Sequence, residues 1–167
     1  MKAPQKKASS EVTIRPARKE DLDSVIALAT ESVVHSLSPF RDTTPQEARR
    51  FRLEDLQALR LYFGTEHLAV FVAECGTAFV GHVILTTGQM EAPTGELQGW
   101  ILDLSVRPEY WSCGIGLRLT EQAEQYAREK GFKYMALGVT TANERAVQFY
   151  SRMGYQEERK RLVKRIG

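Results

Sequence analysis

A strand, a glycine-containing turn and a helix follow one another near the middle of the chain, which restricts the folds open to it. Large apolar side chains occupy every second position of residues 100–106, and the pattern ends before Pro108. This spacing predicts a half-buried strand. The turn at residues 111–116 leads into a predicted helix at 115–130. Such a turn gathers backbone N–H groups that can bind a phosphate. Two glycines could equally serve only a tight turn and close packing of helix on strand.

The rest of the chain predicts further elements in a mixed order. Thr44, Pro45 and Glu47 form a capping box with proline at the first helical position. Strands are expected at residues 12–15, 67–74, 79–87, 134–140 and from 155 onward, and helices at 20–33, 44–64 and 143–153, with a loop at 90–95. This order predicts an α/β fold with a mixed sheet rather than a strictly alternating one.

Length and composition favour one globular domain. The 167 residues are 43% apolar and 26% charged, which is ordinary for a folded domain. Residues 1–10 carry no apolar run and are expected to form a disordered tail before a domain at 11–167. Lysine plus arginine exceed the acids by only 23 to 21, so no nucleic-acid partner is expected. Two cysteines suit a reducing cytoplasm, and no stretch nears the roughly 20 apolar residues of a membrane span.

Several chemistries are disfavoured by spacing. A dinucleotide-binding turn would need glycine or alanine where Leu119 stands, and no Walker phosphate loop occurs. The histidines His35, His67 and His82 fall on separate predicted elements, so no metal site is expected. His67 and His82 are instead expected on strand surfaces. Cys113 precedes a helix start, but no pattern pairs it with a histidine base, so a catalytic thiol is not expected.

Three polar residues stand where chemistry could occur. Asp103 is expected to share a strand face with Ile101 and Ser105, where it could be a base or a merely solvated or hydrogen-bonded carboxylate. Asn143 could simply cap the helix that follows it. Tyr150 could be a core aromatic. The inward side of that last helix is expected to hold Ala146, Val147, Tyr150 and Met153.

Four segments, in order, resemble the GNAT superfamily of acetyl-CoA-dependent N-acetyltransferases. They are Ile14-Arg15-Pro16-Ala17 with Glu20-Asp21-Leu22, the stretch from Leu102 to Tyr110, Gly114-Ile115-Gly116 in the pyrophosphate-loop pattern Q/R-x-x-G-x-G/A, and residues 143–150 with Met153-Gly154-Tyr155. The resemblance implies a mixed, mostly antiparallel central sheet flanked by helices and splayed between its fourth and fifth strands. It also implies acetyl-CoA as acetyl donor, an amine acceptor, direct transfer in a ternary complex and no metal.

The resemblance implies roles for individual residues. Tyr150 would protonate the departing CoA thiolate, Asn143 would hydrogen-bond the pantetheine arm or a catalytic water, and the Leu104 N–H would bind the oxyanion. Asp103 would be the base, with Glu96 or ordered water as alternatives. Cofactor contacts are implied for Leu104, Ser105, Val106, Trp111, Ser112, Cys113, Gly114, Ile115, Gly116, Leu117, Asn143, Phe149 and Tyr150.

Trp111 departs from the family pattern, which has Gln or Arg at this position. Losing a donor to a phosphate would cost about 1.5–3 kcal/mol unless another group replaces it. Trp111 could pack against the cofactor, or Arg107 or Arg118 could supply the charge.

The acceptor side is expected to be walled by residues 36–64 and 87–98. An acceptor with a carboxylate or phosphate would suit the arginines there, but a solvated helix face explains Arg49, Arg50, Arg52 and Arg60 as well. The resemblance is also compatible with a homodimer. The alternative to an enzyme is a sensor or interaction module that binds acyl-CoA on the same fold without turnover.

Overall fold

The computed structural model describes residues 12–167, so the tail expected at residues 1–10 lies outside the described residues. In this described range five strands form one sheet in the order β1-β2-β3-β4-β5. They are β1 (Val12–Pro16), β2 (Leu68–Cys75), β3 (Ala78–Met90), β4 (Leu97–Val106) and β5 (Met135–Leu137). The first four pair antiparallel and β5 runs parallel to β4, which confirms the predicted sheet.

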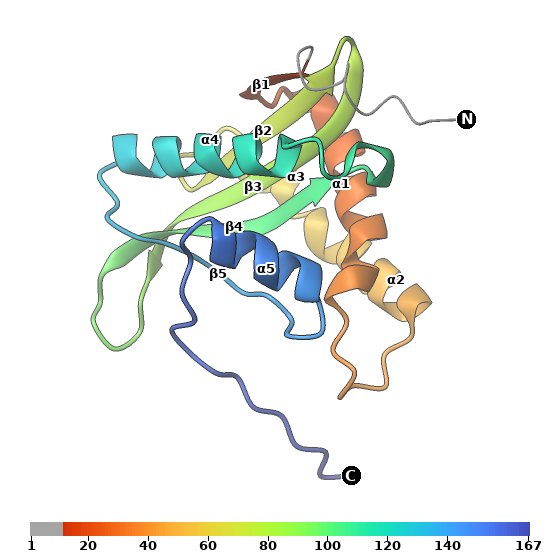
Figure 1. Cartoon of the computed structure of the whole chain (residues 1–167). Coiled ribbons are helices and arrows are strands. Elements are labelled where there is room, and N and C mark those ends of the chain that lie inside the picture. Colours follow the sequence, from red (N-terminus) through yellow and green to blue (C-terminus); the bar gives the residue numbers. More distant parts are fainter. Residues whose placement is uncertain (1–11) are drawn as a thin grey trace.

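Helices cover both faces of this sheet (Figure 1). On one face α4 (Ile115–Glu129) buries Leu119 in the same apolar cluster as Val83 and Leu85 of β3. On the other, α1 (Leu22–Ser32), α2 (Pro45–Leu56) and α3 (Leu59–Tyr62) share a cluster with Ile84 of β3. Each fully buried aliphatic side chain contributes roughly 1.5–3 kcal/mol, so the two clusters fix the sheet between the helices. The last helix is α5 (Glu144–Arg152).

The sheet opens between β4 and β5. Their pairing covers only Gly99 to Ile101 against Met135 to Leu137, whereas β4 continues to Val106. Beyond these pairs the chain leaves β5 and reaches α5 through residues 138–143. The edge of β4 from Leu102 onward therefore has no strand partner on the β5 side, so the two strands separate as the resemblance implied.

Some element boundaries differ from the sequence prediction. The helix predicted over 44–64 begins at its capping box as expected but breaks after Leu56, and α3 is a separate single turn. β3 runs past its predicted end at residue 87 to Met90, the first residue of the predicted loop, and β5 covers only three of the residues predicted at 134–140.

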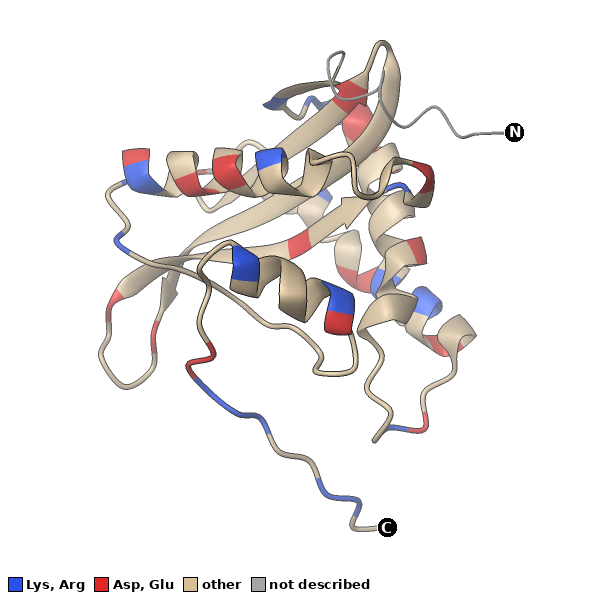
Figure 2. Ribbon diagram, in the orientation of Figure 1, with Lys and Arg blue, Asp and Glu red and all other residues tan. Residues whose placement is uncertain are grey.

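The strand predicted from Tyr155 onward is wrong, because residues 155–167 form no regular element. Much of the segment is charged and exposed, and Figure 2 shows its Lys and Arg residues along an extended path away from the sheet. Its ion pairs with other segments, Arg159 with Glu91 and Arg165 with Asp42, are side-chain contacts and supply no backbone partner for a strand.

Val147 is also not inward as predicted. Its side chain is exposed on α5, whereas Tyr150 packs against the α4-side cluster.

Candidate functional site

An extra residue in β4 sets the direction of its polar side chains. On β3, Ile84 pairs with Asp103 and the next residue, Leu85, pairs with Ile101, so Leu102 is a β-bulge without a partner. The bulge shifts the alternation of faces by one residue. Ile101 therefore packs on the α4 side, and Asp103 faces the α1–α2 side. The prediction that Asp103 shares a face with Ile101 is wrong for this reason.

The same bulge turns a backbone N–H toward the opening. The Gly99 N–H donates to Tyr134 O, on the β5 side, whereas the Arg107 N–H donates to Val80 O, on the β3 side. Successive N–H groups of a strand point to opposite edges of that strand. Counted back from Arg107, the Leu104 N–H therefore points to the β5 side. Since pairing with β5 ends at Ile101, this N–H lies along the open edge of β4.

Asp103 accepts hydrogen bonds from three side chains on three elements. His82 Nε2 of β3 lies 2.8 Å from Oδ1, Ser105 Oγ of β4 lies 2.8 Å from the same oxygen, and Arg52 of α2 donates to Oδ2 over 3.1 Å. Burial by itself would raise the pKa of the Asp103 carboxyl. The hydrogen bond from His82, the attraction of His82 and Arg52, and the hydrogen bond from Ser105 outweigh burial and lower that pKa below its usual value.

Two of these contacts contradict the sequence predictions. His82, expected on a strand surface, has no exposed area, and Arg52, expected on a solvated helix face, is only 16% exposed in its side chain. His67 is exposed as expected, just before β2. The sequence did contain one signal that His82 is buried. It lies within an apolar run, which is typical of a strand covered on both faces.

Tyr150 lies among aromatic rings on the α4 side. The Phe149 and Tyr155 rings contact it edge-on at centroid distances of 5.0 Å and 5.5 Å. Burial, and then the negative charge of Asp103, raise the pKa of the Tyr150 hydroxyl well above its usual value. The Tyr150 hydroxyl therefore stays protonated at neutral pH.

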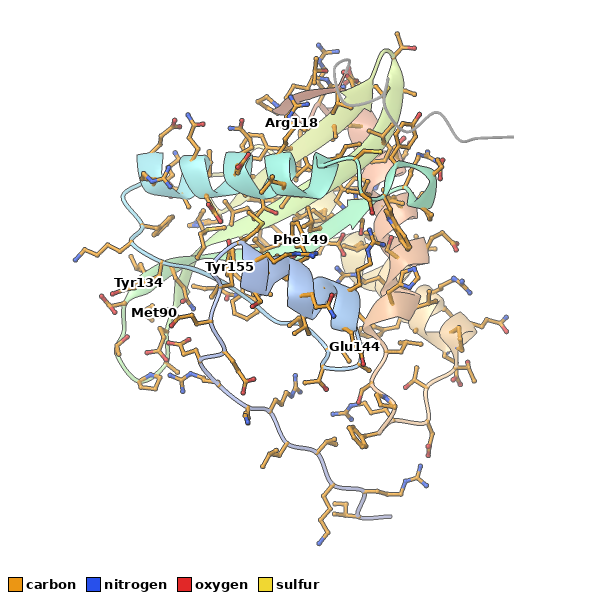
Figure 3. The ribbon with its side chains drawn as sticks, in the orientation of Figure 1. Met90, Arg118, Tyr134, Glu144, Phe149 and Tyr155 are labelled. Atoms are coloured by element: carbon orange, nitrogen blue, oxygen red, sulfur yellow. The ribbon has the colours of Figure 1, made fainter. Side chains whose placement is uncertain are left out.

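The turn before α4 presents its backbone with little side-chain cover. Ser112 and Gly114 have φ angles of 63° and 76°, and Gly114 caps α4 without any side-chain hydrogen bond. The first N–H groups of α4 thus have no capping acceptor there, and the helix dipole adds positive potential. Phe149 of α5 lies across from Gly116, with its ring 3.6 Å from where a Cβ would stand (Figure 3).

Trp111 is fixed by contacts on several sides. Its indole N–H donates to Val106 O over 2.7 Å, and His35 meets the ring edge-on at 5.5 Å. The Arg145 guanidinium stacks 3.6 Å above the ring centroid. Arg145 thus brings positive charge beside the turn that lacks the usual Gln or Arg.

The predicted substitutes for that charge point elsewhere. Arg107 donates to Phe79 O over 2.8 Å and Arg118 to Val12 O over 2.8 Å. Both guanidinium groups are thus engaged with backbone carbonyls away from the turn.

The remaining predicted residues divide between the site and its surroundings. Asn143 caps α5 by accepting from the Ala146 N–H over 3.2 Å, and Glu96 is exposed on the β3–β4 hairpin. Cys113 is a half-buried free thiol. Among residues 12–167, no group of three His, Cys, Asp or Glu side chains could hold a metal. No helix in that described range is long and apolar enough to cross a membrane.

A mixed α/β fold whose sheet separates between β4 and β5 beside a glycine-containing turn is compatible with an acyltransferase domain. The acetyltransferase (GNAT) family model matches residues 31–155, and the chain belongs to this family. It is 30% identical over 138 residues to an uncharacterised N-acetyltransferase of Archaeoglobus fulgidus, covering 83% of this chain and 88% of that protein. The chain is thus an acetyltransferase enzyme, as the sequence predicted.

Solved structures share the fold. A GCN5-related N-acetyltransferase from Ralstonia eutropha JMP134 superposes with a TM-score of 0.77 at 21% identity, over 93% of this chain and 99% of that one. An aminoglycoside N-acetyltransferase in complex with CoA gives a TM-score of 0.70 at 16% identity, over 92% and 93% of the two chains. Two further curated relatives are longer, and the match spans 31% and 43% of their lengths.

Proposed function

We propose that the protein transfers an acetyl group from acetyl-CoA to a primary amine of a small molecule or peptide, by direct attack in a ternary complex. The observation that carries this proposal is the edge of β4 beyond Ile101, which has no strand partner and leads into the glycine-containing turn before α4. Family membership and a CoA complex of the same fold support it. We expect the protein to act in the cytoplasm, where its free thiols Cys75 and Cys113 stay reduced.

Acetyl-CoA would supply an activated thioester, and the turn before α4 would hold its diphosphate. The N–H groups of residues 112–116 and the start of α4 suit an anion there. The open edge of β4 at residues 104–106 would bind the pantetheine arm, beside Phe149, Tyr150 and Asn143. Trp111, Ile115 and Leu117 would complete this binding surface.

Proton transfers would then be divided between Asp103 and Tyr150. A lysine-like amine is only about 0.04% neutral at pH 7, and this neutral fraction, which has already lost one proton to solvent, is the species that attacks. Because Asp103 is a weak base, we expect it to accept the proton after attack, when the nitrogen has become cationic and far more acidic. The Leu104 N–H would stabilise the oxyanion, and Tyr150 would donate its proton to the departing CoA sulfur.

Gly116→Glu tests where acetyl-CoA binds. A negative side chain at this position would repel the diphosphate, so we expect the Kd for acetyl-CoA, measured by calorimetry, to rise at least about 100-fold, or roughly 2.8 kcal/mol. Gly116 has no positive φ, and an added Cβ meets the Phe149 ring only at ordinary contact distance, so the fold should survive. An acid in the first turn of α4 even favours the helix.

Gly116→Gln is the matched control, because it has nearly the same size without the charge. We expect it to weaken binding much less than Gly116→Glu. Equal losses would point to steric obstruction rather than an anion site, and unchanged binding in both would place the diphosphate elsewhere. A CoA-release assay with a panel of amines separates the enzyme from an acyl-CoA sensor, which would bind without turnover.

A further inference from the structure

The Asp103 carboxylate is held by side chains from β3, from α2 and from β4 itself. His82 comes from the neighbouring strand β3, 21 residues earlier in the chain, and Arg52 comes from α2, 51 residues earlier. His82 and Ser105 occupy one carboxylate oxygen and Arg52 the other. These three contacts leave the carboxylate little freedom to rotate, although its side chain keeps 15% of its area exposed.

Within residues 12–167 the His82 ring makes one polar contact, the one with Asp103. The ring has no exposed area, and within the described residues its Nδ1 has no hydrogen-bond partner. Phe79 stacks on it with a centroid distance of 6.1 Å and an interplanar angle of 15°. A carboxylate can only accept, so Nε2 carries the hydrogen of this bond. Burying an imidazole with one nitrogen unpaired is unfavourable for folding, so the orientation of the ring depends on the bond to Asp103 and on the stacking of Phe79.

Arg52 links Asp103 to the helix expected to wall the acceptor side. One of its terminal nitrogens donates to Asp55 over 3.0 Å within α2, and the other donates to Asp103. Arg49, one turn earlier, instead pairs with Glu31, and its side chain is 40% exposed against 16% for Arg52. The two arginines therefore differ in what they contact although they share one helix.

We propose that His82 and Arg52 are positioning residues that hold the Asp103 carboxylate in one orientation for the attacking amine. Through its contact with Asp103, Arg52 couples this orientation to the position of α2. The proposal rests on the proposed acetyl transfer. The charged or titratable groups that bear on Asp103 are His82 from β3, Arg52 from α2 with Asp55 behind it, and Tyr150 from α5.

The test compares Arg52→Met with Arg52→Lys, and His82→Leu with His82→Gln. Arg52→Met and His82→Leu each remove a hydrogen-bond donor to Asp103 and should lower kcat about 10- to 100-fold, since small displacements of a reacting group have effects of this size. The Kd for acetyl-CoA should stay within about twofold of wild type. The conservative Lys and Gln variants should recover part of kcat. Arg49→Met, which removes the same charge from the same helix, should keep the wild-type kcat.

A second readout follows Asp103 itself and needs no turnover. The carboxyl carbon of Asp103 is followed by NMR during a pH titration, with Asp103→Asn for assignment. In Arg52→Met the midpoint should move up by about 1–3 pH units, because a nearby cation holds a carboxyl pKa down by this amount. Arg49→Met should leave the midpoint in place. A moved midpoint shows that Arg52 acts on the Asp103 carboxylate, and the loss of kcat at unchanged Kd distinguishes positioning from a purely structural ion pair.

The outcomes separate the two proposals. Folded Arg52→Met and His82→Leu proteins with wild-type kcat, or an Asp103 titration that does not move in Arg52→Met, would overturn the positioning role while acetyl transfer stands. A wild-type protein that transfers acetyl to no amine would overturn the proposed function and, with it, the catalytic purpose of the positioning. Loss of kcat together with the moved titration supports both.

Discussion

Tyr150→Phe is expected to lower kcat by about 10²- to 10⁴-fold, the usual contribution of a positioned acid or base. The substitution removes only the hydroxyl, so the ring contacts with Phe149 and Tyr155 remain. Without that hydroxyl the CoA sulfur would leave as an unprotonated thiolate. The rate of CoA release at saturating acetyl-CoA and amine measures kcat, and calorimetry measures the Kd for acetyl-CoA. The Kd should change by no more than a few-fold.

Tyr126→Phe is the matched control for Tyr150→Phe, because it makes the same chemical change in another partly buried ring of the α4-side cluster. It should keep the wild-type kcat. The pKa of Tyr150 lies above the ordinary tyrosine value, so wild-type activity should show no loss from its ionisation up to about pH 10. A Tyr150→Phe protein with full kcat would remove this residue from the proposed role.

The parts of the fold that could be predicted depend on local patterns. The capping box at Thr44 and the glycine turn before Ile115 each signal a helix start within a few residues, and both starts lie where predicted. The strand predicted from Tyr155 failed because a strand needs a partner, and pairing is set by tertiary structure rather than by the segment itself. The predicted alternation of side chains between the two faces of β4 is wrong at Leu102 for a related reason, since a bulge depends on the register with β3.

The candidate site was predictable only in part. The turn, Asp103 and Tyr150 lie on elements with clear patterns, so the sequence could nominate them. His82 and Arg52 become neighbours of Asp103 only when β3 and α2 pack against β4, and nothing in their local sequence signals this. The stacking of Arg145 on Trp111 likewise joins two distant segments. Sequence reasoning therefore found candidate chemical groups but not the side chains that tune them.

Asp103→Asn and Asp103→Ala should both lower kcat by about 10²- to 10⁴-fold, because neither side chain accepts a proton from the attacking nitrogen. Their effects on stability should differ. Alanine leaves Arg52 and His82 without their acceptor, and breaking a buried ion pair in this way costs roughly 3–5 kcal/mol. Asparagine keeps an oxygen for His82 and Ser105 and loses mainly the charge, so the free energy of unfolding in urea should fall by a smaller amount.

The pH dependence of stability gives an independent check on the charge of Asp103. Its pKa is lower in the folded protein than in the unfolded chain, so the ionised carboxylate stabilises the fold above the unfolded value of about 3.9. This contribution is lost as pH falls through the lower, folded pKa. The stability difference between wild type and Asp103→Asn should therefore be constant near neutrality and shrink below about pH 4. A difference that grows on acidification would mean that the folded pKa of Asp103 lies above the unfolded value, so that His82, Arg52 and Ser105 do not outweigh the burial of the carboxylate.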